Sequence, residues 1–119
     1  MYEYKAVVTR VVDGDTIKLK IDLGFSIFHD VTVRMLDYDA PEMRGAESPL
    51  GKISKQKLID LIENKTVIVK TEKDKSDKYG RYLARVYIPD AALGDININY
   101  EMLLFVTDLL KESNASEEK

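Results

Sequence analysis

Apolar and polar residues alternate strictly in one segment near the start of the chain. From Thr16 to Leu23 every second residue is apolar, and the residues between them are Thr, Lys, Lys and Asp. This period of two predicts a half-buried strand. Tyr2–Val12 alternates less regularly, and Val31–Leu36 is a third apolar run. Because Asp-Gly, a hairpin signal, separates the first two runs, we expect a three-stranded meander.

Two later segments carry apolar residues at helical spacing. The first begins at Ser48, which can cap a helix, and continues with Pro49, which suits the first helical position. Asn64 can end this helix. The second segment is Ile98–Leu110, in which apolar residues recur three or four positions apart. This spacing predicts a second helix.

Two further strands are expected at Thr66–Glu72 and Leu83–Ile88, and Gly94–Asn97 resembles another turn. The expected order is β-β-β-α-β-β-α. It indicates an α+β, mainly β protein with a five-stranded Greek-key OB-fold barrel. One helix lies between strands three and four, and the other is C-terminal. Other α+β folds share this order, so the order alone leaves them open.

The length of the chain indicates one domain, and its charge is balanced over most of that length. The chain has 119 residues, of which 45% are hydrophobic, which suits one core. We expect a domain at 1–111 and a polar, disordered tail at 112–119. Residues 1–100 carry equal numbers of acidic and basic side chains, so the net charge of −3 resides in the remainder. A neutral body argues against strong non-specific binding to a polyanion but allows a local basic cleft.

Composition excludes several kinds of site. The chain has no cysteine and one histidine, His29. Disulfides, zinc-thiolate sites and chemistry that needs two histidines are therefore excluded. A site for a hard metal ion built from carboxylates remains open.

The N-terminal sequence carries no signal-peptide pattern, since no basic segment precedes an apolar one. The longest apolar run, Met102–Val106, is too short to span a bilayer. We therefore expect a cytoplasmic protein that does not bind membranes, although a viral or trimmed chain would look the same.

The first candidate for chemistry is the turn Asp13-Gly14-Asp15. Taken alone it has the composition of an ordinary hairpin turn. However, Asp15 has the same parity as the apolar residues of the strand that follows. A continuous strand would direct its carboxylate toward the barrel interior, where an unpaired carboxylate is unfavourable unless a cation binds it.

The second candidate is the segment that follows the third strand. Arg34 lies within that strand, and Asp39 and Glu42 follow it. Ordinary surface charge is the simpler interpretation. Pro41 favours another, because the residue before a proline is held extended and the direction of the Ala40 carbonyl is constrained. Two carboxylates and one carbonyl on a stiff segment are a set of oxygen donors of the kind that Ca²⁺ uses.

The third candidate is the turn before the fifth strand, where Lys78, Tyr79 and Arg81 surround Gly80. A basic surface turn would have the same composition. Arg can also offer a planar pair of donors to phosphate oxygens, with Lys and Tyr adding single donors. The turn is therefore a candidate phosphate-binding site.

Together these three stretches resemble the staphylococcal nuclease (thermonuclease-like) family, in order and near its spacing. The resemblance covers about residues 4–104. It implies an OB-fold barrel that hydrolyses phosphodiester bonds of DNA or RNA with Ca²⁺. The expected partner is therefore a nucleic acid, single-stranded or flexible.

The resemblance also implies a role for each matching residue. Asp15, Asp39 and the Ala40 carbonyl look like direct calcium ligands, and Asp13 looks like a group that reaches the ion through water. Glu42 resembles the general base that activates water. The remaining matches are the phosphate-binding arginines Arg34 and Arg81, and Lys78 and Tyr79, which resemble the pair that holds a flanking phosphate.

The last expected helix departs from the family pattern. We expect no third helix within this sequence, and we find in it no counterpart of the tyrosines that line the nucleobase pocket in the best-known member. The segment MLLFVTDLLKE, from Met102 to Glu112, is more apolar than one contact face needs. We expect the helix to run long and either cover the barrel or pair with a second copy, giving a monomer or a weak homodimer.

Two other functions remain open. The fold could serve as a catalytically weak nucleic-acid-binding or scaffold module, although such a module would be expected to lose carboxylates or arginines. An OB-fold single-strand binder would show exposed aromatic residues on the second and third strands. The second strand, Thr16–Leu23, has none.

Overall fold

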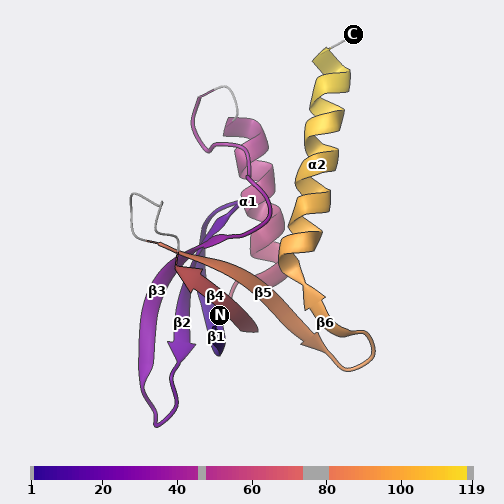
Figure 1. Ribbon diagram of the computed structural model, residues 1–119. Coiled ribbons are helices and arrows are strands. Elements are labelled where there is room, and N and C mark those ends of the chain that lie inside the picture. Colours follow the sequence, from indigo (N-terminus) through magenta and orange to yellow (C-terminus); the bar gives the residue numbers. More distant parts are fainter. Residues whose placement is uncertain (1, 46–47, 74–80, 118–119) are drawn as a thin grey trace.

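The computed structural model describes residues 2–45, 48–73 and 81–117. Within these ranges the chain forms six strands and two helices (Figure 1). In chain order they are β1 (Tyr2–Asp13), β2 (Thr16–Asp22), β3 (Phe28–Met35), α1 (Ser48–Ile62), β4 (Thr66–Lys73), β5 (Tyr82–Asp90), β6 (Gly94–Asn97) and α2 (Ile98–Glu117).

The first five strands close into a barrel. β1 pairs antiparallel with both β2 and β4, while β2 also pairs with β3 and β4 with β5. A short parallel pairing of β3 with β5, from Val33↔Tyr82 to Met35↔Ala84, completes the circle. The predicted five-stranded OB-type barrel, with one helix between the third and fourth strands and another at the C-terminal end, is therefore confirmed.

Alternation along the strands fills the barrel interior. Ile17 and Leu19 of β2 are almost completely buried, as predicted. They pack with Val8 and Val11 of β1 and with residues of the other strands and both helices. Leu23, which has the same parity, is 48% exposed because β2 ends before it.

β6 is an element that the sequence analysis missed, because Gly94–Asn97 was expected to be a turn. The Asp90 carboxylate accepts hydrogen bonds from the backbone N–H groups of Ala92 and Leu93, 2.8 and 2.9 Å away. Gly94 then adopts a φ of 77°. This tight reversal sends the chain back along β5, where Asn97 pairs with Tyr87. The turn therefore lies at residues 91–93, directly before the segment that was predicted to be the turn.

α1 begins at Ser48, as predicted, and its C-terminal end is attached to β1. Asn64 follows the helix with a φ of 65°, the left-handed conformation typical of a helix end. Its N–H donates to the Val8 carbonyl over 2.7 Å. The Glu63 side chain accepts a hydrogen bond from the Val11 N–H over 3.0 Å. These bonds fix α1 over the barrel end that carries the β1–β2 turn.

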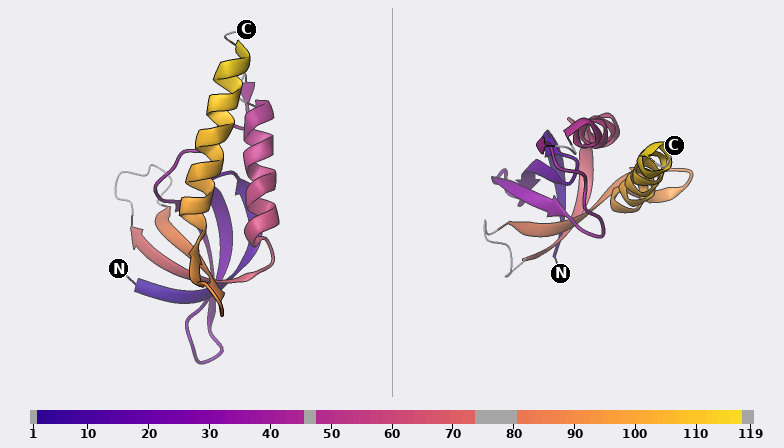
Figure 2. Two further views of the ribbon diagram at one scale, coloured as in Figure 1. Left: turned by 90° about the vertical axis from the view of Figure 1, so that its right-hand side faces the viewer. Right: turned by 90° about the horizontal axis from the view of Figure 1, so that it is seen from above.

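α2 runs long, as expected: it continues past the helical pattern that ends at Leu110 and reaches Glu117, so it includes most of the segment expected to be a tail. The first half of α2 lies beside α1, and Figure 2 shows the C-terminal part of α2 extending beyond it. Met102 and Val106 are buried against the barrel, whereas Leu104 is 47% exposed. Among the described residues, neither helix is long and apolar enough to cross a membrane.

Candidate active site

An open cleft of about 690 Å³ gathers charged side chains beside the β1–β2 turn. It brings together most of the residues singled out from the sequence: Asp13, Asp15, Arg34, Ala40, Glu42 and Arg81. Asp39 does not line the cleft but lies next to it, paired with Arg34. Lys78 and Tyr79 lie outside the described residues, so their predicted role remains a prediction.

The β1–β2 turn is held tightly at the floor of the cleft. The Asp13 carboxylate accepts a hydrogen bond from the Asp15 N–H over 3.2 Å. A Cβ atom at Gly14 would lie 2.7 Å from the Cβ of Ala40 and 2.9 Å from that of Ser54, so only glycine fits. The turn is thus packed between α1 and the segment after β3, which fixes the directions of both aspartates.

The surroundings of the Asp15 carboxyl group raise its pKa. Its two oxygens accept hydrogen bonds from the Thr16 hydroxyl, at 3.2 Å, and from the Ala40 N–H, at 3.1 Å. Burial, followed by the hydrogen bond and charge of Asp13, raises the pKa of Asp15 from 3.8 to about 6. The Ala40 N–H and Arg34 oppose this rise. Two carboxyl groups are thus held together where a positive charge would stabilise both.

Contacts to the barrel fix the first half of the segment that follows β3. Asn99, which is fully buried at the start of α2, donates to the Leu36 carbonyl over 2.9 Å. Asp37, with a φ of 78°, accepts two hydrogen bonds from Arg85 of β5, at 3.0 and 3.1 Å. The chain therefore leaves β3 in one defined direction.

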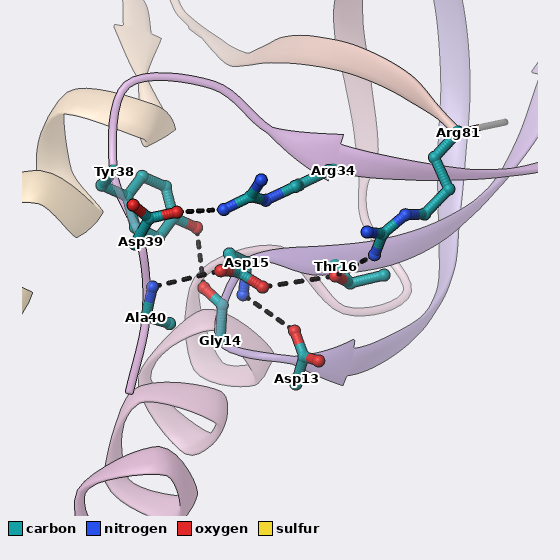
Figure 3. Close-up of polar contacts among 9 residues, drawn as sticks. All are labelled: Asp13, Gly14, Asp15, Thr16, Arg34, Tyr38, Asp39, Ala40 and Arg81. Atoms are coloured by element: carbon teal, nitrogen blue, oxygen red, sulfur yellow. Dashed lines mark hydrogen bonds and ion pairs between the residues drawn. The ribbon is translucent and has the colours of Figure 1, made fainter. Parts of the chain in front are cut away.

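The second half of the segment faces the β1–β2 turn (Figure 3). The buried Tyr38 hydroxyl donates to the Gly14 carbonyl over 2.7 Å. Burial, followed by the charges of Asp15 and Asp13, raises the pKa of this hydroxyl above its usual range. Asp39 forms an ion pair with Arg34, and the Ala40 N–H reaches Asp15. Each residue from 36 to 40 is thus held by a different partner.

Two arginines lie on either side of Thr16. Arg34 of β3 is the register partner of Thr16 on β2. Arg81, immediately before β5, donates from Nη1 to the Thr16 hydroxyl over 3.4 Å. Figure 3 shows both guanidinium groups extending toward the turn that carries Asp15 and the start of β2. The cleft therefore presents two planar cations above an acidic pair.

Glu42 lines the same cleft and is exposed to solvent. Its backbone is pressed against Gly51 of α1. A Cβ atom at residue 51 would lie 2.7 Å from the Glu42 carbonyl carbon and 3.0 Å from the Pro41 carbonyl oxygen. Gly51 is thus needed for the close approach that places Glu42. The sequence analysis missed it, since a lone glycine within a helical pattern gives no indication of what packs against it.

Comparison with known proteins identifies the family. The family model of the staphylococcal nuclease homologues matches residues 32–104, which is more than half of the chain. The chain belongs to the staphylococcal nuclease family. The match includes Arg34, Asp39, Glu42 and Arg81, but it begins after the turn that carries Asp13.

Named relatives agree with membership of the staphylococcal nuclease family. "Protein ParB" of Escherichia coli is 38% identical over 72% of this chain and 43% of its own length. The "Micrococcal nuclease" of Shigella flexneri is 38% identical over 73% of the chain and 44% of its length. The "Thermonuclease" of Staphylococcus intermedius is 33% identical over 71% and 49%. The chain spans about half the length of these relatives.

The residues of this staphylococcal nuclease family member fit a bound cation in part. In favour of a cation, the negative charges of Asp13 and Asp15 repel each other, and a cation between them would relieve this repulsion. Their carboxylate oxygens are hard donors of the kind that suits Ca²⁺. On the other hand, the described residues contain no cluster of three or more acidic, histidine or cysteine side chains that could hold a metal ion. The third expected donor, Asp39, is paired with Arg34.

Proposed function

We propose that the chain is a calcium-dependent nuclease of the thermonuclease type, which hydrolyses phosphodiester bonds of DNA, RNA or both. One observation carries the proposal. A single cleft combines an acidic pair, Asp13 and Asp15, with the guanidinium groups of Arg34 and Arg81 and the carboxylate of Glu42. Relatives named as nucleases support the same reaction.

The two arginines bind the scissile phosphate in this proposal. A phosphodiester is an anion, and attack by water concentrates more negative charge on its non-bridging oxygens. Arg34 of β3 and Arg81, immediately before β5, line the same cleft, so both guanidinium groups can donate to those oxygens. Once Arg34 is released from Asp39, the two guanidinium groups stabilise the charge that develops in the transition state.

Glu42 acts as the general base. Its exposed carboxylate lines the cleft and takes a proton from the attacking water. Gly51 contributes indirectly, because its missing side chain allows the Glu42 backbone to lie against α1. Loss of the Glu42 carboxylate is therefore expected to lower turnover much more than substrate binding.

The residues that would hold calcium are Asp15, Asp39 and the Ala40 carbonyl, with Asp13 acting through water. When bound, the ion polarises the attacking water and offsets negative charge on the phosphate. Asp15 holds its carboxylate ready through its bonds to Thr16 and Ala40. Asp39 would have to leave Arg34 to hold the ion, which would also free the Arg34 guanidinium group to bind phosphate.

The substrate in this proposal is a single-stranded or flexible nucleic acid, since a rigid duplex has fewer ways to enter a recessed cleft. Lys78 and Tyr79 remain candidates for binding a flanking phosphate. A monomer or a weak homodimer through α2 remains the expected state, because Leu103, Leu104 and Leu110 are partly exposed on that helix. Light scattering over a range of concentrations measures which of these forms.

The proposal is tested by incubating the protein with end-labelled single-stranded DNA and RNA. Cleavage is expected with Ca²⁺ and should stop when a chelator is added. Asp15→Asn should abolish the calcium-dependent cleavage, while the control Asp95→Asn, an exposed position outside the cleft, should not. If no divalent ion supports cleavage but the strands still bind, the protein is instead a binding module with a nuclease fold.

A further inference from the structure

A second cavity of about 240 Å³ opens at the barrel end where β1 begins and β2 ends. It shares no lining residue with the catalytic cleft. We call it the mouth cavity, and it is lined by Tyr2, Tyr4, Ile21, Leu23, His29, Val31, Val33, Thr71 and Tyr82. None of the proposed catalytic residues lines the mouth cavity.

Among the described residues, the lining of the mouth cavity is aromatic and includes no acidic, lysine or arginine side chain. Three of its residues are tyrosines, and the rings of Tyr2 and Tyr4 lie 6.4 Å apart at an angle of 33°. Tyr2 and Tyr82 are 73% and 40% exposed, so these residues remain accessible. Aliphatic residues such as Val33 form the floor, and the hydroxyl groups and the imidazole of His29 add polar atoms. Such a lining suits a flat, uncharged ring with polar edges.

The mouth cavity is connected to the catalytic cleft through two adjacent strands. Val33 and Tyr82 line it and are register partners across the β3–β5 pairing. The next residue after Val33 is Arg34, and the residue before Tyr82 is Arg81, and both arginines line the cleft. Since consecutive residues of a β-strand point to opposite faces, a nucleic-acid strand whose phosphate lies between the arginines reaches the cavity by passing around the start of β5.

We propose that the mouth cavity binds a nucleobase of the single strand whose phosphate is held by Arg34 and Arg81. The inference rests on the proposed function for its phosphate site. Stacking on aromatic side chains is a main source of affinity for single strands and tolerates any base. A base in a duplex stays in its stack and is not available to the cavity, so the site would favour single strands. A free nucleoside has the same ring and could enter as well.

The direct test measures binding of labelled single-stranded DNA to variants made in a Glu42→Gln background, in which cleavage is blocked. Tyr82→Leu and Tyr2→Ala should each weaken binding about fivefold or more. Tyr100→Leu, at an exposed tyrosine of α2 outside the cavity, should change it less than twofold, which is about the error of such a measurement. Tyr2→Ala keeps the test valid if Tyr82→Leu fails to fold, because Tyr2 is largely exposed.

A second arm uses strands with a single abasic residue placed at successive positions. One position should weaken binding as much as Tyr82→Leu does, and the two losses should not add. Free thymidine, observed through amide chemical shifts of Tyr4, His29 and Tyr82, reports whether the base alone enters. Shifts there mean that the cavity also accepts a free nucleoside, and their absence means that the bound phosphate is needed.

The outcomes separate this inference from the proposed function. If the wild type does not cleave the strand with any divalent ion but binding still depends on Tyr82 and on one base, the mouth site stands and the nuclease proposal fails. If cleavage proceeds, the abasic series is flat and both mouth variants bind like Tyr100→Leu, the mouth site is wrong and the nuclease proposal stands.

Discussion

Arg34 and Asp39 form an ion pair across the end of β3. The proposed reaction needs the two groups separately, since Arg34 is to bind phosphate and Asp39 is to bind calcium. Their pairing therefore links the two binding events. Whatever removes Asp39 from Arg34 also makes the guanidinium group available to the substrate.

This pairing predicts opposite effects of one substitution. Asp39→Asn should weaken calcium binding at least tenfold, because it removes a charged ligand. In the absence of metal, the same variant should bind single-stranded DNA about two- to fivefold more tightly, since Arg34 is no longer neutralised. Calorimetry for calcium and fluorescence anisotropy for DNA measure the two effects. A metal-free affinity equal to or below that of the wild type would contradict the link.

The raised pKa of Asp15 predicts how stability depends on pH without metal. The carboxyl group has a pKa of about 6 when folded, against 3.8 for the unperturbed group. The folded state keeps its proton between these values while the unfolded state loses it. The free energy of unfolding should therefore fall as pH rises from about 4 to about 6, and stay low above that.

The matching variant is Asp15→Asn, which cannot ionise. Without metal at pH 7 it should be more stable than the wild type by on the order of 1 kcal/mol, a value reduced for solvent screening. Its stability should lack the fall between pH 4 and 6. Urea unfolding at several pH values measures both, with the exposed Asp95→Asn as control. A variant that retains the pH-dependent fall would assign the effect to another group.

Substitution of Gly51, which does not line the cleft, should still lower turnover. In Gly51→Ala the new methyl group overlaps the Glu42 backbone, so the general base has to move. Since displacement by about 1 Å can cost 100-fold in rate, kcat should fall at least tenfold. Calcium affinity should change little, because Asp15 is held by other contacts. Lys52→Ala, at the next and exposed position of α1, is the control and should keep its kcat.

Asn99 predicts a large effect on stability. Its side chain accepts a hydrogen bond from the Val86 N–H over 2.8 Å and donates to the carbonyls of Ala84 and Leu36. Asn99 itself is fully buried. Asn99→Leu keeps the branched shape of the side chain but removes the partners of these backbone groups. The free energy of unfolding should fall by about 2–4 kcal/mol, measured by urea titration. A loss below about 0.5 kcal/mol would show that the three bonds are not important for stability.

Local patterns in the sequence were sufficient for the five barrel strands and for the start of α1. Alternation identified β2 because one face of that strand is buried, and Ser48 and Asn64 mark their helix ends by local capping. β6 was missed because its four residues pair only through a turn fixed by Asp90. A side-chain contact of that kind has no simple sequence signature.

For the site, the sequence identified residue types but not their partners. The parity of Asp15 indicated a side chain directed inward, and Asp15 is half-buried. The pairing of Asp39 with Arg34, and the roles of Gly51 and Asn99, depend on segments that are distant in the chain or on the path of an irregular segment. These contacts follow from how α1 and α2 pack on the barrel, which no local pattern specifies.

The central claim is that Glu42 activates water for attack on a phosphodiester held by Arg34 and Arg81. Its most direct test compares the wild type with Glu42→Gln, in Ca²⁺, for both cleavage and binding of single-stranded DNA. The account predicts that kcat falls at least 100-fold while the dissociation constant changes less than about threefold. Cleavage by Glu42→Gln at the wild-type rate would contradict it.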